Sequence, residues 1–410
     1  MTTVVLGKGG FGEVRLARRL ADGVKVGVKI ISKVQFRGEE ERRLMLLEAE
    51  LHQRVSGHPN VTQLYEWLED PGNFYMVMEL STGGELMERI LSSHTFSERV
   101  AARYFRQMAQ GLSHIHSKLV VHRDLKPENF LLADSSEDAQ IKITDFGLSA
   151  AVASPDAVLT DPCGSAFYIA PEIFARAYTR AADVWALGVI LYLLLSGNVP
   201  FGSTAKSEPE VYAAIKAQSL CFGPDWNHLS GHARELVSGL LEKDPLKRYT
   251  LEQALCHPWV TGESAPDAPL ALSLVESLRT FNAQNKFKKQ ALKLVASSLS
   301  AVDVAALRAS FHKIDTDNTG AWRRAARRPC ARQRPRAQRP RAQRPRAPAP
   351  APAPPPRAPA RLTPLAPFPP SAPLPPPPPR LPVLRGDAGC AGGHGRGWRR
   401  RGHARHHQEH

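Results

Sequence analysis

The sequence contains 410 residues with a formal net charge of +15, and its apolar content of 42% suffices for the core of one or more domains. Its five cysteines lack CxxC pairs or regular spacing, which argues against a zinc site and a secreted disulfide framework. The N-terminal apolar run is too short for a signal peptide, residue 2 is not the Gly that N-myristoylation needs, and no apolar run is long enough to span a membrane, so we expect a soluble cytoplasmic or nuclear protein.

A glycine-rich segment between two apolar runs predicts a hairpin near the N-terminus. It reads Gly7-Lys8-Gly9-Gly10-Phe11-Gly12-Glu13-Val14. Glycines let a backbone lie close over phosphates, and exposed amides can bind their charge. A dinucleotide-binding fingerprint would need a helix directly after the glycines, whereas a second strand-like run, Val24–Ile31, follows here. The pattern therefore favours a phosphate-binding hairpin.

The next segments predict a helix, a strand and a second helix. Residues 39–55 are charged and leucine-rich, and the apolar residues at helical spacing are Leu44, Leu47 and Leu51. Residues 74–80 predict a strand that runs into a glycine-containing linker, Ser81–Gly84. Glu85 then begins a helix. Its apolar residues are Leu86, Ile90 and Leu91.

Further along the chain, a polar string places a carboxylate, a cation and an amide at short offsets. It reads Val121-His122-Arg123-Asp124-Leu125-Lys126-Pro127-Glu128-Asn129-Phe130. Phosphoryl transfer needs a base to orient the attacking hydroxyl, positive charge near the moving phosphate and an oxygen ligand for magnesium. Asp124, Lys126 and Asn129 have the chemical types for these tasks, which indicates a catalytic loop. Asp145, in the strand and turn Ile141–Gly147, supplies a second oxygen ligand suited to Mg²⁺.

These strings resemble the signature motifs of protein kinases. The loop is similar to H-R-D-L-x-x-x-N, and Val26-Gly27-Val28-Lys29 is similar to the V-A-I-K strand. Lys126, two residues after Asp124, resembles the serine/threonine branch. The resemblance implies an α+β, bilobal fold with a β-rich small lobe at 1–80 and a helical large lobe at 81–260. It also implies a serine/threonine kinase that uses ATP and Mg²⁺ to phosphorylate protein substrates.

The same resemblance implies the residues of the nucleotide site. The residues that would cover the nucleotide are Leu6, Gly7, Lys8, Gly9, Gly10, Phe11, Gly12 and Val14. Lys29 would hold the α and β phosphates and pair with an acid of the next helix, for which Glu48 is preferred and Glu50 is the alternative. Asn129 and Asp145 would hold magnesium.

The resemblance also implies roles around the linker between the lobes. Met78 would be the gatekeeper, and the backbone of Glu79–Ser81 would contact adenine. Gly27 stands where the family usually has Ala, which should loosen the packing on adenine. Glu85 would read a basic residue upstream of the phosphorylated residue in a substrate. An acid at the start of a helix also has a simple explanation in the helix dipole.

The activation segment would run from Leu148 to Glu172. Arg123 precedes the catalytic Asp and could recruit an anion from this segment. The candidates for that anion are Asp156 and Asp161 as permanent charges, and phosphorylated Thr160 or Ser165 as regulated ones. The sequence leaves these alternatives open.

The large lobe contains residues that the resemblance makes structural. Asp183 would brace the catalytic-loop backbone, and Arg248 would pair with Glu172. The apolar run Val184–Leu195 is too short for a membrane span and predicts a buried core helix. His257 has the chemical type of a metal ligand, but no second ligand lies nearby in the sequence, so we expect it to pack in the core.

After the predicted large lobe, residues 271–295 show the pattern of a basic amphipathic helix. Such a helix can be an autoinhibitory or calmodulin-type target segment, or simply a surface helix docked on the large lobe. Together with the strings Leu278–Leu292 and Phe311–Gly320, it resembles the plant and protist calcium-dependent protein kinases, in which a pseudosubstrate junction precedes a calmodulin-like domain. The resemblance implies an autoinhibitory junction at 261–320 and a calmodulin or calmodulin-like partner at 271–300.

The resemblance stops inside the first calcium-binding loop. An EF-hand loop uses ligands at positions 1, 3 and 5, a Gly at position 6 and a bidentate Glu at position 12. Asp315, Asp317, Thr319 and Gly320 fill the first four places, but position 12 is Ala326. We therefore expect no physiological calcium affinity, and a junction whose own calcium sensor is missing.

The positive charge lies in the tail. After residue 321 there are 20 Arg, no Lys and two acids, which gives +18 and leaves −3 for the preceding residues. The same segment holds 22 of the 35 prolines. Such a composition cannot bury enough apolar surface to fold, so we predict a disordered Arg/Pro/Ala-rich tail at 321–410. It could bind nucleic acid, acidic surfaces or PxxP-reading domains.

A non-catalytic alternative follows from the short ends of the predicted kinase domain. Only six residues precede Gly7, so the first strand is short. In this alternative the fold would bind nucleotide as a scaffold or decoy, and the basic tail would recruit partners. The polar residues needed for catalysis are all present, which favours the enzyme.

Overall fold

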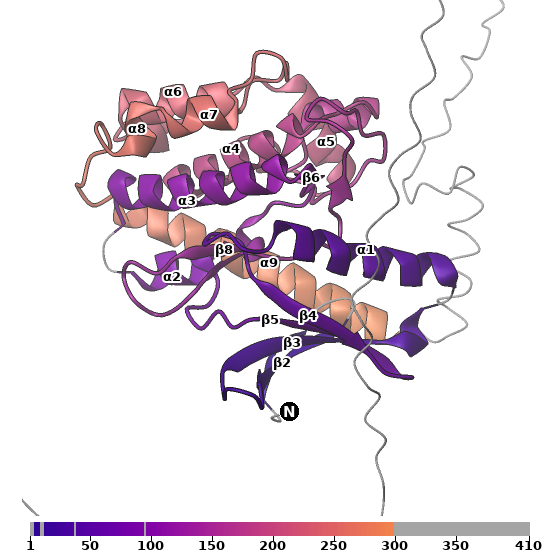
Figure 1. Cartoon of the computed structure of the whole chain (residues 1–410). Coiled ribbons are helices and arrows are strands. Elements are labelled where there is room, and N and C mark those ends of the chain that lie inside the picture. Colours follow the sequence, from indigo (N-terminus) through magenta and orange to yellow (C-terminus); the bar gives the residue numbers. More distant parts are fainter. Residues whose placement is uncertain (1–3, 9–11, 37, 94–95, 299–410) are drawn as a thin grey trace, which may run out of the picture. The chain divides into compact units, whose positions relative to one another are not determined.

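The computed structural model describes residues 4–8, 12–36, 38–93 and 96–298, which all belong to the unit Met1–Arg328. Three of the predictions above lie outside these residues: the EF-hand start at 315–320 with Ala326, the tail at 321–410, and the glycine-segment residues Gly9, Gly10 and Phe11. Figure 1 shows the strands β2–β5 gathered at one end of the described unit, with α3, α4, α6, α7 and α8 at the other.

The small lobe is built on a five-stranded antiparallel sheet with the order β1-β2-β3-β5-β4. The strands are β1 (Val5–Lys8), β2 (Glu13–Arg18), β3 (Lys25–Ser32), β4 (Leu64–Glu69) and β5 (Asn73–Glu79). Branched residues such as Val26 and Val28 favour extended backbone and are buried. Gly7 lies opposite Val14, and β1 and β2 pair antiparallel, as expected for the two strands of the predicted hairpin.

One helix of the small lobe, α1, spans Glu39–Val55, the range that the sequence predicts. Its buried face contacts the sheet and the large lobe through Met45, Ala49, Leu51 and Val55. The prediction that Leu44 belongs to this apolar face is wrong, because Leu44 is 56% exposed. The adjacent Met45 faces inward instead, and packs in the small-lobe cluster with Ile31, Phe74 and Met76.

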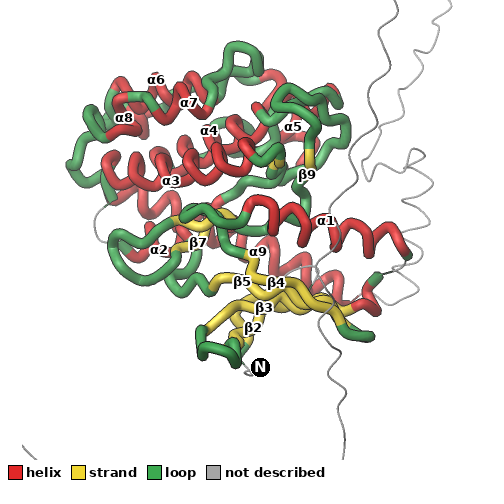
Figure 2. The backbone as a smooth tube through the Cα atoms, viewed as in Figure 1, coloured by secondary structure: helices red, strands yellow, loops and turns green. Residues whose placement is uncertain are grey.

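The large lobe is mainly helical. Its helices are α2 (Leu86–Ser92), α3 (Glu98–Ser117), α4 (Ala181–Ser196), α5 (Glu208–Ala217), α6 (Gly231–Leu240), α7 (Leu251–Leu255), α8 (Pro258–Thr261) and α9 (Leu272–Ser298). Short 3-10 helices lie at η1 (Lys33–Gln35) in the small lobe and at η2 (Pro127–Asn129), η3 (Pro171–Ala175) and η4 (Pro224–Trp226). Two small antiparallel ladders pair β6 (Val120–Val121) with β9 (Ala150–Ala151), and β7 (Phe130–Leu132) with β8 (Ile141–Ile143). Figure 2 labels two of these short strands, β7 near α2 and β9 near α5.

Helix α4 forms the centre of the large-lobe core. The apolar run Val184–Leu195 is buried along its whole length, as the sequence predicts, and α3 and α6 pack against it. Its end is set by Gly197, whose φ of +74° is the left-handed conformation common at helix C-termini. In the part of the chain that the structure describes, no helix combines the length and apolar character that crossing a bilayer requires.

Helix α9 docks on the large lobe against α2 and α4. Leu278 is fully buried in this contact and Leu274 nearly so. The packing is close, because a Cβ added to Gly197 would lie 2.5 Å from the Cβ of Ser277. Lys286 also makes an ion pair with Glu88 of α2, at 2.6 Å. The predicted helix at 271–295 is therefore confirmed, and so is the α+β, two-lobed architecture.

Candidate active site

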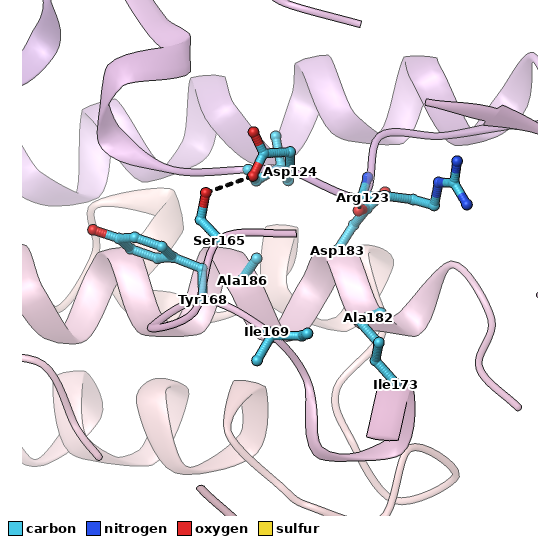
Figure 3. Close-up of a pocket in the computed structure, with 10 residues that line it drawn as sticks. Arg123, Asp124, Ser165, Tyr168, Ile169, Ile173, Ala182, Asp183 and Ala186 are labelled. Atoms are coloured by element: carbon cyan, nitrogen blue, oxygen red, sulfur yellow. Dashed lines mark hydrogen bonds between the residues drawn. The ribbon is translucent and has the colours of Figure 1, made fainter. Parts of the chain in front are cut away.

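The catalytic-loop residues converge around the carboxylate of Asp124. This side chain is 8% exposed, and the ammonium group of Lys126 contacts its Oδ2. The hydroxyl of Ser165 donates to Oδ1 of Asp124 at 2.7 Å, and Lys126 Nζ lies 3.3 Å from the same hydroxyl. Figure 3 shows the Ser165 and Asp124 side chains pointing toward each other. A carboxylate, a cation and a hydroxyl therefore meet at one point, as phosphoryl transfer to a hydroxyl requires.

The buried carboxylate of Asp183 holds the backbone of this loop. Its Oδ2 accepts from the backbone N–H of His122 and its Oδ1 from that of Arg123, both at 2.8 Å, while His116 Nε2 lies 2.8 Å from Oδ2. Burial alone would raise the pKa of Asp183, but the hydrogen bond and charge of His116 outweigh it and lower that pKa. These bonds hold Arg123 at a φ of +68°, a strained conformation for a residue with a side chain.

The hairpin β7–β8 brings the two predicted metal ligands together. Phe130 pairs with Ile143, so Asn129, one residue before Phe130, and Asp145, two residues after Ile143, lie at the same end of the hairpin. The Asn129 amide donates from Nδ2 to the backbone oxygen of Asp124 at 2.8 Å, which leaves its Oδ1 available. Asp145 is held at a φ of +67° with its side chain 50% exposed. Two oxygen donors, one of them charged, fit a hard cation such as Mg²⁺.

Lys29 of β3 reaches the same place from the small lobe. Its Nζ lies 2.6 Å from Oε1 of Glu48 and 4.0 Å from Oδ1 of Asp145. Burial alone would lower the pKa of Lys29, but the charges of Glu48 and Asp145 outweigh it and raise that pKa, so the ammonium stays charged. Of the two acids that the sequence offered, Glu48 is the partner. Glu50 instead pairs with Arg54 on the exposed side of α1.

Strands β1 and β2 flank this region through β3, because Val14 of β2 pairs with Lys29 of β3. Gly7 and Lys8 belong to β1, after the 48% exposed Leu6, and Val14 belongs to β2. At Gly12, which has a φ of +159°, an added Cβ would lie 2.0 Å from the carbonyl oxygen of Ile30. No other residue fits there, because the hairpin crosses β3 too closely.

In the linker between the lobes, some polar groups of Glu79 already have hydrogen-bond or ion-pair partners within the protein. Met78 packs against the small-lobe core beside β3. The side chain of Glu79 turns away to Lys142 of β8 at 2.8 Å, and its backbone N–H donates to the Gln63 carbonyl at 2.8 Å. The predicted contact of Glu79 with a base would therefore use its backbone carbonyl rather than its side chain.

A pocket lined by two acidic residues lies beside the catalytic loop. Glu85, at the N-cap of α2, lines it together with Glu128 from the catalytic-loop string. The opposite wall is formed by α9 through Phe281, Asn282 and Asn285. Sequence reasoning singled out Glu85 but not Glu128. The available signal was its position directly before Asn129 in the catalytic-loop string.

Residues of the activation segment have partners that the sequence did not indicate. The guanidinium of Arg123 donates to the backbone oxygen of Leu148 at 2.5 Å and to the Tyr178 hydroxyl at 3.3 Å. Tyr178 in turn donates to the carbonyl of Asp161 at 2.7 Å. Ser165, a sequence candidate for a phosphorylated partner of Arg123, contacts Asp124 instead. Its place is in the catalytic cluster.

Arg248 and His257, two residues outside the site, were also singled out from the sequence. Arg248 pairs with both oxygens of Glu172 at 2.6 and 2.9 Å, as predicted. His257 is buried as predicted, but the statement that no second ligand lies nearby is wrong, because α6 brings Glu235 and His232 close to it. The Nδ1 of His257 accepts from the Trp259 backbone N–H at 3.2 Å. Its proton therefore sits on Nε2, which makes that atom a donor and unsuited to a metal.

Comparisons with known proteins agree with this geometry. The family described as "Protein kinase domain" matches residues 2–260. Calcium-dependent protein kinase 34 of Arabidopsis thaliana is 41% identical over 317 residues, which is 77% of this chain and 60% of that protein. Calcium-dependent protein kinase 5 of Oryza sativa subsp. japonica is 41% identical over 318 residues, covering 77% of this chain and 57% of that protein. The chain thus spans about 60% of the length of the relatives it matches.

Proposed function

This chain belongs to the protein kinase family, and on that premise we propose that it transfers the γ-phosphoryl group of ATP to serine or threonine hydroxyls of protein substrates. The observation that carries the proposal is the convergence of Lys29, Asp124 and Asp145, three residues far apart in the chain, on one cluster. Lys29 lies 4.0 Å from Asp145. The backbone N–H of Thr144, next to Asp145, donates to the Asn129 carbonyl at 3.0 Å, and Asn129 Nδ2 donates to the Asp124 carbonyl at 2.8 Å.

In this proposal Asp124 orients the attacking hydroxyl and accepts its proton. The hydroxyl of Ser165, donating at 2.7 Å, shows that the Asp124 carboxylate can hold a hydroxyl at that distance. Lys126, in contact with Asp124 Oδ2, supplies positive charge beside the transferred group. Lys29, fixed by Glu48, binds the nucleotide phosphates.

Asn129 and Asp145 would hold magnesium through their side-chain oxygens. Magnesium supplies positive charge that neutralises the phosphate oxygens. Asn129 suits this role because its amide nitrogen is bonded to the Asp124 carbonyl, which leaves the side-chain oxygen as the atom that can bind a cation.

We further propose that α9 inhibits the enzyme by covering the site for protein substrates. Phe281, Asn282 and Asn285 of α9 face Glu85 and Glu128 across the pocket beside the catalytic loop. Two acids at this place would attract a basic residue upstream of the phosphorylated residue. Displacement of α9 is therefore the proposed step that admits substrate.

Calmodulin or a calmodulin-like protein is the proposed partner that displaces α9. Support comes from the lysines of its C-terminal half and from the relatives, whose names state calcium dependence. The chain itself lacks the Glu of the first calcium loop, because Ala326 takes its place. A calcium sensor in trans would then replace one in cis.

Replacement of Asp124 tests the catalytic proposal directly. Asp124→Asn keeps the shape of the side chain and removes its basicity, so we expect phosphate transfer to a basic peptide to fall by about a thousandfold while ATP affinity is retained. Turnover at the wild-type rate in the variant would refute the assignment. A chain that binds ATP but shows no turnover even when calcium and calmodulin are added, and even in Phe281→Ala, would instead support the scaffold alternative.

A further inference from the structure

The first part of α9, residues 272–278, packs into the large lobe like a core helix, and we call it the buried segment. Leu278 is fully buried and Leu274 is 7% exposed, and both belong to the apolar cluster that contains α4. Gly197, just after α4, lets the two backbones approach, because an added Cβ would lie 3.2 Å from the Leu274 carbonyl oxygen and 2.5 Å from Ser277 Cβ. A side chain at position 197 would therefore push α9 away.

The chain that leads into the buried segment is also bonded to the large lobe. The backbone N–H of Leu270 donates to the Phe96 carbonyl at 2.7 Å. The hydroxyl of Ser97, the N-cap of α3, donates to the Asp267 carboxylate at 3.0 Å. Removal of the buried segment would therefore break contacts that belong to the folded large lobe itself.

The next part of α9, residues 281–287, makes weaker contacts, and we call it the covering segment because it lines the pocket beside the catalytic loop. None of these seven residues is buried. Phe281 is only partly buried, with its ring centroid 6.4 Å from that of Phe167. The side chains of the Lys286–Glu88 ion pair are 47% and 50% exposed, and such a pair contributes little to stability in water. The covering segment can therefore detach at a much lower cost than the buried segment.

Thr280 lies between the two segments and weakens the helix there. Its hydroxyl donates to the Glu276 carbonyl, four residues back, at 2.9 Å. A side-chain bond of this kind slightly destabilises a helix and often bends it. Arg279 and Thr280 are both exposed, so a bend at this place would disturb no buried side chain.

We propose that α9 works in two parts: the buried segment stays in the large lobe, and only the covering segment, bending at Thr280, leaves the pocket to admit substrate. A calmodulin-type partner would then bind the chain from residue 280 onward rather than the whole of α9. The inference rests on the proposed function, since it assumes that α9 covers the site for protein substrates.

Hydrogen exchange of the full chain, measured by mass spectrometry of overlapping peptides, tests whether α9 opens in one step or in two. Amides that open only with the core are the slowest to exchange, whereas amides in a locally opening segment exchange faster. We expect residues 276–279 to exchange as slowly as α4, and residues 284–287 to exchange about a hundredfold faster or more. Equal exchange rates along residues 276–287 would overturn the inference.

Phe281→Ala tests whether the covering segment opens alone. Loss of the ring contact should speed up exchange at residues 284–287 by about threefold to tenfold and leave residues 276–279 unchanged. Phe287→Ala is the control, because Phe287 is 73% exposed and its loss should change neither segment. Faster exchange at residues 276–279 in Phe281→Ala would show that α9 leaves as one unit, contrary to the inference.

A matched pair of glycine variants tests the buried segment separately. Gly197 and Gly262 each follow a helix with a left-handed backbone, at φ +74° and +91°, so alanine strains both. A Cβ at Gly262 meets nothing within 4 Å, whereas one at Gly197 meets α9. Gly197→Ala should therefore lower the melting temperature by about 5 °C more than Gly262→Ala does, and should speed up exchange at residues 276–279. Equal melting temperatures would show that the buried segment is not part of the folded large lobe.

Failure of the proposed function has a different outcome, because hydrogen exchange and melting temperature do not depend on activity. Two-step exchange together with unchanged peptide phosphorylation in Phe281→Ala would contradict the proposed inhibition by α9. The division of the helix into two segments would still hold in that case.

Discussion

The hydroxyl of Ser165 donates a hydrogen bond to the carboxylate of Asp124 at 2.7 Å, which fastens the activation segment to the catalytic loop. Ser165→Ala removes this bond and lets the segment move. A hydrogen bond to a charged group contributes about 1.5–3 kcal/mol, so kcat should fall by about tenfold to a hundredfold. Steady-state assays with a basic peptide measure the change in kcat. The KM for ATP should not change.

Ser154→Ala is the control for that experiment. Ser154 lies exposed in the same segment. Equal rates for Ser165→Ala and Ser154→Ala would show that the Ser165 contact has no part in catalysis.

Glu48 is expected to act through Lys29, which it holds at 2.6 Å. Glu48→Gln keeps the size of the side chain and removes the charge. Breaking a buried ion pair on one side costs about 3–5 kcal/mol, so we expect kcat/KM to fall by about a hundredfold or more. Glu50→Gln, on the same helix but paired with Arg54 at the surface, should retain activity. Similar losses in both variants would point to helix α1 as a whole rather than to the Lys29 pair.

Phe281 anchors α9 near the proposed substrate site, with its ring 6.4 Å from that of Phe167. Phe281→Ala should loosen the helix and raise activity toward a basic peptide about threefold to tenfold, the effect of losing an aromatic contact. Phe287, which is 73% exposed on the same helix, provides the control, because Phe287→Ala should leave activity unchanged. Activity that does not rise in Phe281→Ala would argue against autoinhibition by α9.

His52 makes the stability of the fold sensitive to acid. Burial lowers its pKa from 6.5 to about 4, the charge of Lys29 adds to this, and the hydrogen bond to the Thr62 carbonyl opposes it. The unfolded chain binds this proton below pH 6.5 and the folded chain only near pH 4. The contribution of His52 to the free energy of unfolding is therefore fully present above pH 6.5. It falls, by on the order of 3 kcal/mol, as the pH drops to 4.

Urea unfolding at several pH values measures this effect in the wild type and in His52→Leu. The variant lacks the titrating group, so its acid-side loss of stability should be smaller. His228→Leu, at an exposed position, serves as the control and should follow the wild type. Parallel pH curves for the wild type and His52→Leu would contradict the assignment.

Arg248 is a structural residue, since its side chain is fully buried and bonded to both oxygens of Glu172. Arg248→Met leaves the Glu172 charge buried without its partner, so the free energy of unfolding should fall by about 3–5 kcal/mol. Arg248→Lys should also lose stability, because an ammonium group cannot donate to both oxygens in parallel. The adjacent Lys247→Met should change it by less than about 1 kcal/mol, because its pair with Asp244 is exposed. Denaturant unfolding distinguishes these outcomes.

The sequence alone predicted the parts of the candidate site whose residues lie close together in the chain. Asp124, Lys126 and Asn129 lie within one loop, and their types and offsets predict that they gather at one point, as their contacts in the structure show. The pairing of Lys29 with Glu48 needed the family resemblance, because the helix offers several acids and only the angle of α1 to β3 selects one. The family resemblance was also needed for Asp183, because its bonds to the loop backbone depend on where α4 meets that loop.

The sequence alone did not predict contacts between segments that are far apart in the chain or that depend on the rotation of a helix. Ser165 looked like a site for phosphorylation, and nothing in the chain indicated that its hydroxyl would reach Asp124 across 41 positions. Leu44 matched helical spacing, yet one residue of rotation exposes it and buries Met45. Glu235 approaches His257 only because α6 and α8 pack together.

The bonds of Asp183 to the N–H groups of His122 and Arg123 tie the catalytic loop to the first turn of α4, the most deeply buried helix in the described part of the large lobe. These two amide hydrogens should exchange with deuterated solvent only when α4 itself opens. The loop would then melt with the large lobe rather than fray alone, so the catalytic geometry would persist as long as that lobe stays folded.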